Sequence, residues 1–218
     1  YNSDPKSAFG GIILLNRKIN SKLAKEIFKY FFEIVVAPSF DNSALKILQK
    51  KKNLILLRIP KIKFNTLEYK STNFGDIYQT CDLTQINKQF LTLVSEKKTS
   101  SKYILDLIFS LKVAKHLKSN AVVLSNNKQT LGIGHGQTNR FDALSYAIKN
   151  KKKYFKNDLY VCASDGFFPF TDSINLLHKS GCSVVAQPSG SKNDMKIIAF
   201  SNRNKISLYF VKNRLFKH

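Results

Sequence analysis

The chain has 218 residues, and 43% of them are hydrophobic, which is enough to bury the core of one large domain or two small ones. No apolar run reaches the roughly eighteen residues that a membrane-spanning helix needs. The start of the chain, residues 1–5, has neither the basic nor the apolar region of a secretory signal. We therefore expect no membrane span in the chain. The chain also lacks an initiator Met, so we expect it to be a piece of a longer protein.

The formal net charge of +22 suggests nucleic-acid binding, but the kind of basic residue argues against it. Only five of the 36 basic residues are arginines, although bidentate recognition of bases and phosphates favours arginine. The lysines are scattered, and the abundance of Lys, Asn and Ile is typical of an AT-rich genome. We therefore expect no nucleic-acid partner, and a positive field that attracts small anionic substrates.

The three cysteines, Cys81, Cys162 and Cys182, have neither disulfide nor metal-site spacing. Cys162 and Cys182 lie in apolar strand patterns and are expected to be buried thiols, as in a cytoplasmic protein. The sequence contains no H-x-E motif with P-C-x-x-C, no H-E-x-x-H and no C-x-x-C. We therefore predict no metal site.

Apolar periodicity predicts alternating strands and helices, and hence a layered α/β fold. In chain order the predicted elements are a buried strand at 11–16, an amphipathic helix at 21–32, a strand at 34–37, a helix at 41–50, strands at 53–59, 65–70 and 75–81, a polar connector at 84–100, the longest helix at 101–118, a hairpin at 121–124 and 129–133, a helix at 138–150, a strand at 159–163, a helix at 172–179, a strand at 183–186, a helix at 194–201 and a strand at 206–210. No internal repeat is evident.

The segment from Ser164 to Asp172, S-D-G-F-F-P-F-T-D, joins the strand at 159–163 to the helix at 172–179. Ligands of α/β folds usually bind beyond the carboxyl ends of the strands. The aromatic rings of this segment can therefore sandwich a flat ligand while Asp172 hydrogen-bonds its edge. A packed corner with Asp172 as a helix N-cap explains the same residues equally well.

The segment from Gly132 to Arg140 also joins a strand to a helix. Its glycines allow a ligand to approach the backbone, and the helix start favours an anion, although a tight structural turn is at least as consistent with the pattern. The spacing is not that of the dinucleotide fingerprint. Arg140 in the first helical turn opposes the helix dipole, which indicates that it has another role.

Three further places combine polar residues with an element end. Asn120 closes the helix at 101–118, either as an ordinary helix end or as an amide that donates to a developing oxyanion. The turn at 187–192 precedes a helix, and the tail at 214–218 alternates charge with Leu and Phe, which favours a docked tail. Lys115 and His116 are more consistent with surface residues than with a proton-transfer pair.

Together these segments resemble one family, the AICAR transformylase domain (phosphoribosylaminoimidazolecarboxamide formyltransferase) of bifunctional purine biosynthesis proteins. The resemblance runs nearly end to end and rests on many motifs in the same order. The matching segments are residues 3–11, 33–40, 50–53, 112–121, 132–140, 163–170, 187–191 and 214–218.

The resemblance implies a pair of cytidine-deaminase-like α/β/α layered subdomains without the deaminase zinc. Residues 1–95 would hold the remainder of a truncated first subdomain plus a connector, and residues 96–218 the second subdomain. The implied reaction transfers a formyl group from 10-formyltetrahydrofolate, the co-substrate, to the amino group of AICAR in IMP biosynthesis. Because that amine is a poor nucleophile, the reaction needs a base, an oxyanion stabiliser and close alignment. A homodimer is also implied.

The resemblance further implies roles for individual residues. The AICAR-binding residues would be Gly10, Glu33, Asn120, Arg140, Phe167 and Arg214. Of these, Asn120 would lie near the reacting groups, and Arg214 would bind the phosphate. The folate-binding residues would be Phe141, Asp172, Ser191 and Lys192, with Asp172 on the pterin edge.

Two departures from the family pattern limit these expectations. The catalytic Lys-His pair of the family lies in a K-H-x-x-P-x-G motif that we expect upstream of Asp4, as we do the cyclohydrolase domain, and Lys115-His116 does not match that motif. Gly166 replaces the usual alanine, which we expect to be a mild change. The alternatives are a non-catalytic nucleotide- or folate-binding homologue and a basic nucleic-acid-binding protein.

Overall fold

The computed structural model describes residues 1–61, 66–156 and 159–217, and it confirms the mixed α/β class. The chain forms two compact units, Ser3–Thr84 and Gln85–His218, whereas the sequence prediction placed residues up to 95 with the first. The predicted strand at 65–70 begins on Asn65, which lies outside the described residues, as does His218 at the end of the predicted tail. Among the described helices, none is both long and apolar enough to cross a membrane.

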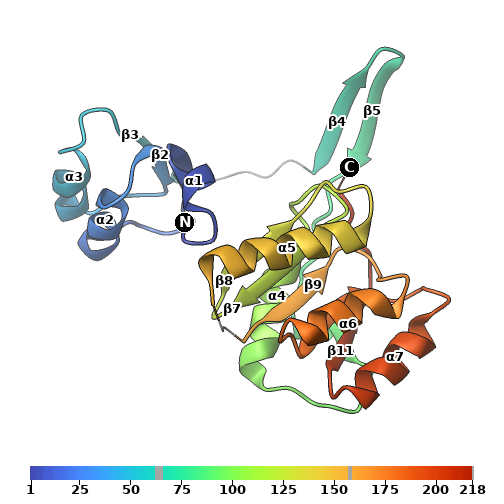
Figure 1. The fold of residues 1–218 in the computed structure, drawn as a ribbon. Coiled ribbons are helices and arrows are strands. Elements are labelled where there is room, and N and C mark those ends of the chain that lie inside the picture. The colour runs from blue at the N-terminus through green and yellow to red at the C-terminus, as the bar shows by residue number, and fades with distance from the viewer. Residues whose placement is uncertain (62–65, 157–158, 218) are drawn as a thin grey trace. The chain divides into compact units, whose positions relative to one another are not determined.

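The first unit contains a parallel sheet in the order β1-β2-β3 (Figure 1). Its strands are β1 (Gly11–Leu14), β2 (Phe32–Ala37) and β3 (Ile55–Arg58), and its helices are α1 (Pro5–Ala8), α2 (Ser21–Phe28) and α3 (Asn42–Leu48). The α2 and α3 helices connect the strands and pack on each other. Their apolar sides form a core with one face of the sheet, which includes Ile27, Val35 and Leu48.

Two sequence predictions for the first unit are wrong in detail. The strand at 11–16 is not buried, because β1 is an edge strand whose alternate side chains Ile12 and Leu14 are 64% and 62% exposed. The helix at 21–32 ends at Phe28, because the N–H of Lys29 turns back to carbonyls of the preceding turn and Phe32 pairs in the sheet. Phe31 therefore leaves the apolar helix face and is 44% exposed.

A two-stranded antiparallel hairpin follows, formed by β4 (Leu67–Thr72) and β5 (Gly75–Thr80). All of its side chains are exposed. The rings of Tyr69 and Tyr78 face each other across the two strands with centroids 6.2 Å apart. Such a pair contributes to hairpin stability where no core is available.

The second unit is built on a six-stranded mixed sheet in the order β6-β11-β10-β9-β7-β8. The strands are β6 (Leu91–Leu93), β7 (Val122–Asn126), β8 (Gln129–Gly134), β9 (Val161–Ser164), β10 (Val184–Pro188) and β11 (Ser207–Val211). The three strands β9, β10 and β11 are parallel, and the others are antiparallel to their neighbours. The connector predicted at 84–100 is wrong, because Leu91 and Leu93 pack on the core and draw β6 into the sheet edge beside β11.

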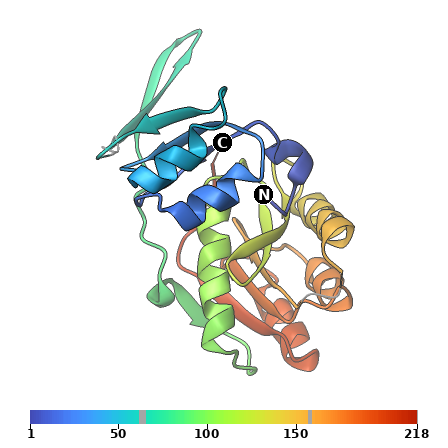
Figure 2. The same cartoon turned by 90° about the vertical axis from the view of Figure 1, so that its left-hand side faces the viewer.

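Helices cover both faces of this sheet (Figure 2). They are η1 (Lys88–Phe90), α4 (Ser101–Ala114), α5 (Arg140–Tyr154), α6 (Thr171–Lys179) and α7 (Asp194–Arg203). Strand side chains alternate between the two faces: Val161 and Ala163 share a core with α4, and Cys162 shares the other core with α5, α6 and α7. Because β9, β10 and β11 are parallel, their carboxyl ends lie at the same edge of the sheet, where the corners that lead into α6 and α7 lie.

Other boundaries differ from the prediction by a few residues. The α4 helix ends at Ala114, four residues earlier than expected, so α5 with 15 residues is longer than α4 with 14. The predicted hairpin is confirmed, with a shorter turn at Asn127 and Lys128, whose φ angles of 52° and 55° suit a two-residue turn.

The succession β9-α6-β10-α7-β11 has the same topology as β1-α2-β2-α3-β3 in the first unit. In both units the three strands are parallel, lie in sequence order and are joined by two helices that pack on each other. A structural repeat therefore exists that the sequence analysis did not detect.

Candidate substrate site

The aromatic corner between β9 and α6 is partly core and partly surface. Phe168 is fully buried, and its N–H donates to the side-chain carbonyl of Gln187 on β10 at 3.2 Å. Phe170 is 61% exposed and takes the N-cap position of α6. Asp172 is therefore not the N-cap, and both of its hydrogen bonds, from N–H and Oγ of Ser173, fall on Oδ1. The corner is thus packed core at Phe168, and a ligand-facing role of its exposed side chains stays a prediction.

Arg140 starts α5 and reaches the same corner. Its side chain is 11% exposed, its Nη2 pairs with Oδ1 of Asp165 at 3.0 Å, and its Nη1 donates to the carbonyl of Phe167 at 3.2 Å. Its Nε is buried, and no hydrogen-bond partner for it lies among the described residues. Arg140 was inferred to have another role because a cation at a helix start opposes the helix dipole. That role is a tertiary contact, because the β9–α6 corner binds the guanidinium.

The C-terminal tail brings a second guanidinium to the corner. Arg214 lies over the ring of Phe167, with Cζ 4.9 Å from the centroid. The ring of Phe216 has both guanidinium carbons, those of Arg140 and Arg214, at 5.7 Å from its centroid. Leu215, which lies between Arg214 and Phe216 in the sequence, is buried in the core that includes α4, so the tail is docked as predicted. Two cations that stack on aromatic rings leave an electropositive site suited to an anion.

Gly166 lies tightly against this cluster. A Cβ atom at Gly166 would come 2.3 Å from Nη2 of Arg140 and 2.7 Å from Cε1 of Phe216. An alanine at this position therefore requires both side chains to move. The contacted atoms are the ends of flexible side chains, so the expectation that glycine in place of the family's alanine is a mild change stays a prediction.

Asn120 lies beside the cluster, but its amide is turned toward the backbone. Its Nδ2 donates to the carbonyls of Gln137 at 2.9 Å and Thr138 at 3.2 Å. In this conformation the amide hydrogens hold the turn that leads into α5, and a donation to a developing oxyanion stays a prediction. The side-chain carbonyl is the part of Asn120 that those two bonds do not use.

The residues predicted to bind folate come from three element starts. Phe141 is exposed in the first turn of α5, and Asp172 is exposed in the first turn of α6. Ser191 and Lys192 lie in the turn between β10 and α7. This turn is held against the aromatic corner by Asn193, whose side-chain N–H donates to the carbonyl of Pro169 at 2.7 Å.

Gly10 and Glu33, the two AICAR-binding residues predicted in the first unit, are neighbours. Gly10 has a φ of 71°, and its N–H donates to the carbonyl of Phe31 at 3.1 Å, next to β2. A Cβ atom at Gly10 would lie 3.6 Å from Oε1 of Glu33. The exposed carboxylate of Glu33 therefore lies directly beside a backbone position that favours glycine.

Two glycines of the segment at 132–140 serve packing rather than ligand approach. A Cβ atom on Gly132 would lie 2.1 Å from the carbonyl oxygen of Ala147, and one on Gly134 would lie 1.8 Å from that of Ala143. The β8 strand thus needs both glycines because α5 crosses it in direct backbone contact. This packing role differs from the tight turn that the sequence suggested as the structural alternative, because both glycines lie within the β8 strand.

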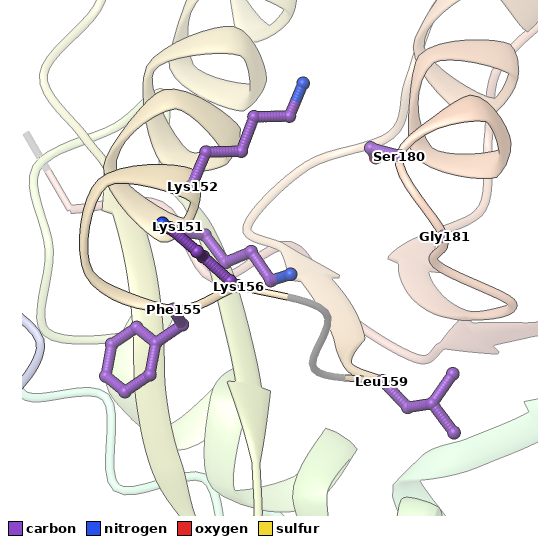
Figure 3. A pocket seen from close by; sticks show the side chains of 7 residues that line it. All are labelled: Lys151, Lys152, Phe155, Lys156, Leu159, Ser180 and Gly181. Carbon is purple, nitrogen blue, oxygen red and sulfur yellow. The ribbon is translucent and has the colours of Figure 1, made fainter.

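A surface hollow lies elsewhere, between the end of α5 and the loop after α6 (Figure 3). It is lined by Lys151, Lys152, Phe155, Lys156, Leu159, Ser180 and Gly181. The Lys151 ammonium lies 5.0 Å from the ring centroid of Tyr160. None of the predicted site residues lines this hollow.

The buried thiols contribute no nucleophile to the site. Cys162 and Cys182 are buried, as predicted, and burial raises the pKa of Cys182 to about 12 and that of Cys162 well above its usual range. Across the ranges that the structure describes, no three or more His, Cys, Asp and Glu side chains group as metal ligands.

Sequence reasoning missed three residues that shape the cluster: Ser119, Asp165 and Phe216. Asp165 lies within the segment that was singled out, but only its neighbours were given roles. A carboxylate directly after a buried strand and before a glycine was the available signal. Phe216 gave a similar signal, as an aromatic residue between the basic residues of a tail.

Comparison with known proteins gives a family. The model of the AICARFT/IMPCHase bienzyme family matches residues 1–150. The bifunctional purine biosynthesis proteins PurH of Caldicellulosiruptor saccharolyticus and of Buchnera aphidicola subsp. Schizaphis graminum are 43% and 44% identical over 100% of this chain. The chain spans 42% of the length of each.

A similar relation holds for the PurH protein of Acetivibrio thermocellus, at 43% identity over the whole chain and 43% of that protein. Among solved structures, the dCMP deaminase from cyanophage S-TIM5 in apo form matches with a TM-score of 0.36 and 13% identity, covering 45% of this chain and 91% of that chain. Because the family model covers more than half of the chain, the protein belongs to the AICARFT/IMPCHase bienzyme family.

Proposed function

We propose that the chain belongs to the transformylase part of a bifunctional enzyme, and that this part transfers a formyl group from 10-formyltetrahydrofolate to the amine of AICAR with the help of a Lys-His motif that the chain lacks. Family membership supports a role in purine biosynthesis. The observation that carries the finer assignment is the cluster of Arg140, Asp165, Phe167 and Arg214 at the carboxyl end of β9. It combines a hydrogen-bonding fork with a second cation, which suits a substrate that carries a carboxamide on its base and a phosphate on its ribose.

In this proposal the described residues bind and orient the substrates. Arg214 pairs with the AICAR phosphate, and Arg140 holds the base and its carboxamide beside the backbone of Phe167. Asp172, Phe141, Ser191 and Lys192 line the folate, with the Asp172 carboxylate accepting N–H groups of the pterin. Gly10 and Glu33 keep their proposed role in binding AICAR. Alignment of this kind lowers the barrier for a weak amine nucleophile, while the base is supplied by the family's Lys-His motif.

We further propose a cytidine-deaminase-like fold for the second unit, in line with the helices on both faces of its sheet. The resemblance of the sequence also supports a cytoplasmic homodimer without a resident metal. An active monomer in sedimentation at working concentration would exclude the dimer.

The decisive experiment separates the two activities of a bifunctional protein. In a protein of the relatives' full length that contains this chain, Arg140→Ala is expected to depress formyl transfer to AICAR strongly while leaving cyclisation of the formylated product to IMP unchanged. Loss of cyclisation alone would assign this chain to the cyclohydrolase part. Binding of both substrates without turnover in the unsubstituted protein would instead indicate a non-catalytic homologue.

A further inference from the structure

Asp165 lies inside the cluster, although the resemblance gives it no role. Its side chain is completely buried, and each carboxylate oxygen has one partner: Oδ1 accepts from Nη2 of Arg140 at 3.0 Å, and Oδ2 accepts from Oγ of Ser119 at 2.5 Å. A carboxylate without solvent is very costly unless it is paired and hydrogen-bonded. Both conditions are met here, so the position of each partner is tightly determined.

The main chain of Asp165 reaches two other parts of the proposed AICAR site. Its N–H donates to the carbonyl of Ala121 at 3.0 Å, and its carbonyl accepts from the N–H of Leu215 at 2.9 Å. Ala121 follows Asn120, and Leu215 follows Arg214. Together with its ion pair to Arg140, Asp165 therefore connects three residues that are expected to bind AICAR: Asn120, Arg140 and Arg214.

The geometry of Arg140 depends most directly on Asp165. A guanidinium offers five N–H donors in a rigid plane, and the bonds to Asp165 and to the Phe167 carbonyl fix the orientation of that plane. The guanidinium carbon of Arg214 lies at the same distance of 5.7 Å from the Phe216 ring centroid as that of Arg140, and it carries the same charge. Asp165 offsets the repulsion between the two cations, so both can be retained in one site.

We propose that Asp165 is a positioning residue for AICAR: its carboxylate fixes the guanidinium plane of Arg140 so that the remaining donors face the substrate carboxamide. The proposal rests on the proposed function. Asp165 acts through Arg140 and does not touch the substrate, because it is buried beneath the guanidinium. Ser119 supports it by holding the second carboxylate oxygen.

The test is Asp165→Asn in a protein of the relatives' full length that contains this chain. An asparagine keeps an acceptor for Arg140 and presents an amide to Ser119, whose hydroxyl can accept, so the shape is preserved while the charge is lost. We expect the Michaelis constant for AICAR to rise by about ten- to a hundredfold, the range for a hydrogen bond between charged groups. The Michaelis constant for 10-formyltetrahydrofolate is expected to change less than about twofold.

Asp106→Asn provides a matched control. Asp106 is also a buried carboxylate, but it accepts the N–H groups of Asn127 and Lys128 in the hairpin turn. The Asp106→Asn variant is expected to have a lower free energy of unfolding in urea without a selective change in the Michaelis constant for AICAR. If Asp165→Asn raises both Michaelis constants equally, or lowers that for AICAR, the positioning role is wrong.

A double-mutant cycle tests whether Asp165 acts through Arg140. In an Arg140→Ala background, Asp165→Asn is expected to add almost nothing to the Michaelis constant for AICAR, because the group that it orients is gone. Full additivity would overturn the proposal. Absence of formyl transfer in the unsubstituted protein would refute the proposed function instead, so the two failures are distinguishable.

Discussion

Two arginines at the proposed AICAR site are held by different forces. Both guanidinium groups lie against the ring of Phe216, but Arg140 is also held by an ion pair and a carbonyl, whereas Arg214 also stacks on the ring of Phe167. Stacking leaves the N–H edge of a guanidinium available for hydrogen bonds. The tail arginine is therefore the better candidate for direct contact with a phosphate.

Substitutions of Arg214 and Asp172 are expected to separate the two substrates. In a full-length protein, Arg214→Ala should raise the Michaelis constant for AICAR, because a charge-assisted phosphate contact is lost. Arg214→Lys should recover only part, because lysine lacks the bidentate fork. Asp172→Ala should weaken folate binding by roughly 1–3 kcal/mol, the cost of unpaired pterin donors.

Steady-state kinetics with each substrate varied in turn measures both effects. If Asp172→Ala changed only the AICAR constant, or if neither substitution had an effect, the transfer of roles from the family would be wrong. Lys179→Ala is a control for Asp172→Ala. Lys179 is exposed at the other end of α6, so its substitution removes a charge from the same helix away from the corner.

The buried thiols predict a loss of stability at high pH. Burial raises the pKa of Cys182 from 9.0 to about 12, so the unfolded chain loses this proton at a lower pH than the folded one. The contribution of Cys182 to the free energy of unfolding is fully present below about pH 9. It falls as the pH rises toward about 12, by at most about 1.4 kcal/mol per pH unit.

Urea unfolding between about pH 8 and pH 11 measures this slope. Cys182→Ala should reduce this slope by the share of one group. Some slope should remain in this variant, because burial also raises the pKa of Cys162 and of Tyr160. An unaltered slope in Cys182→Ala contradicts the assignment.

At the scale of elements, the contact between β8 and α5 depends on glycine. Gly134→Ala would place a methyl group 1.8 Å from a backbone carbonyl, so the helix must move away from the sheet. We expect destabilisation of about 1–3 kcal/mol or more, measured as a lower urea midpoint. Lys149→Ala, an exposed position on the same helix, should change stability by only a few tenths of a kcal/mol. Equal stability of both variants would show that the helix adapts freely.

Elements with strong local signals were predictable from the sequence, and those that depend on distant partners were not. The succession of strand, aromatic corner and helix at β9–α6 follows from apolar runs and a proline. The β6 strand has only three residues in a polar segment, and it forms because β11 offers an open edge more than a hundred residues away. The end of α2 was overestimated because Tyr30 and Phe31 continue its apolar pattern while Phe32 is drawn into β2.

The same distinction applies to the candidate site. The family resemblance assigned Arg140, Phe167 and Arg214 to AICAR binding, and the fold brings all three together. It assigned no role to Asp165, whose partners lie in the segment before β7, at the start of α5 and in the tail. It also did not give the direction of the Asn120 amide, which depends on the turn packed against it.

At the scale of the whole molecule, the second unit contains all of the residues of its two cores. Every buried member of these cores lies at or after Ile86. A chain limited to residues 85–218 is therefore expected to unfold cooperatively in urea, with circular dichroism as the signal. A transition without cooperativity would show that the first unit is required for folding.

A shorter chain of residues 96–218 is the matched comparison. It lacks β6 together with the core residues Ile86 and Phe90, and it also loses the hydrogen bond from the N–H of Leu208 to Oγ of Ser95. It should have a clearly lower urea midpoint than the chain of residues 85–218. Equal midpoints would favour the boundary predicted from the sequence over the one that follows from the contacts.

The 218-residue chain by itself is expected not to catalyse formyl transfer. Its two Lys-His dipeptides, Lys115-His116 and Lys217-His218, do not match the K-H-x-x-P-x-G motif of the family. Lys115 caps the end of α4, and the N–H of His116 bonds back to the carbonyl of Val113, so this pair belongs to a helix end.

A missing general base typically costs about 10²–10⁴ in rate. Formyl transfer is measured with the purified chain, 10-formyltetrahydrofolate and AICAR, beside a complete transformylase. Comparable turnover that disappears in His116→Ala would show that His116 is the base, and the expected inactivity would then be wrong.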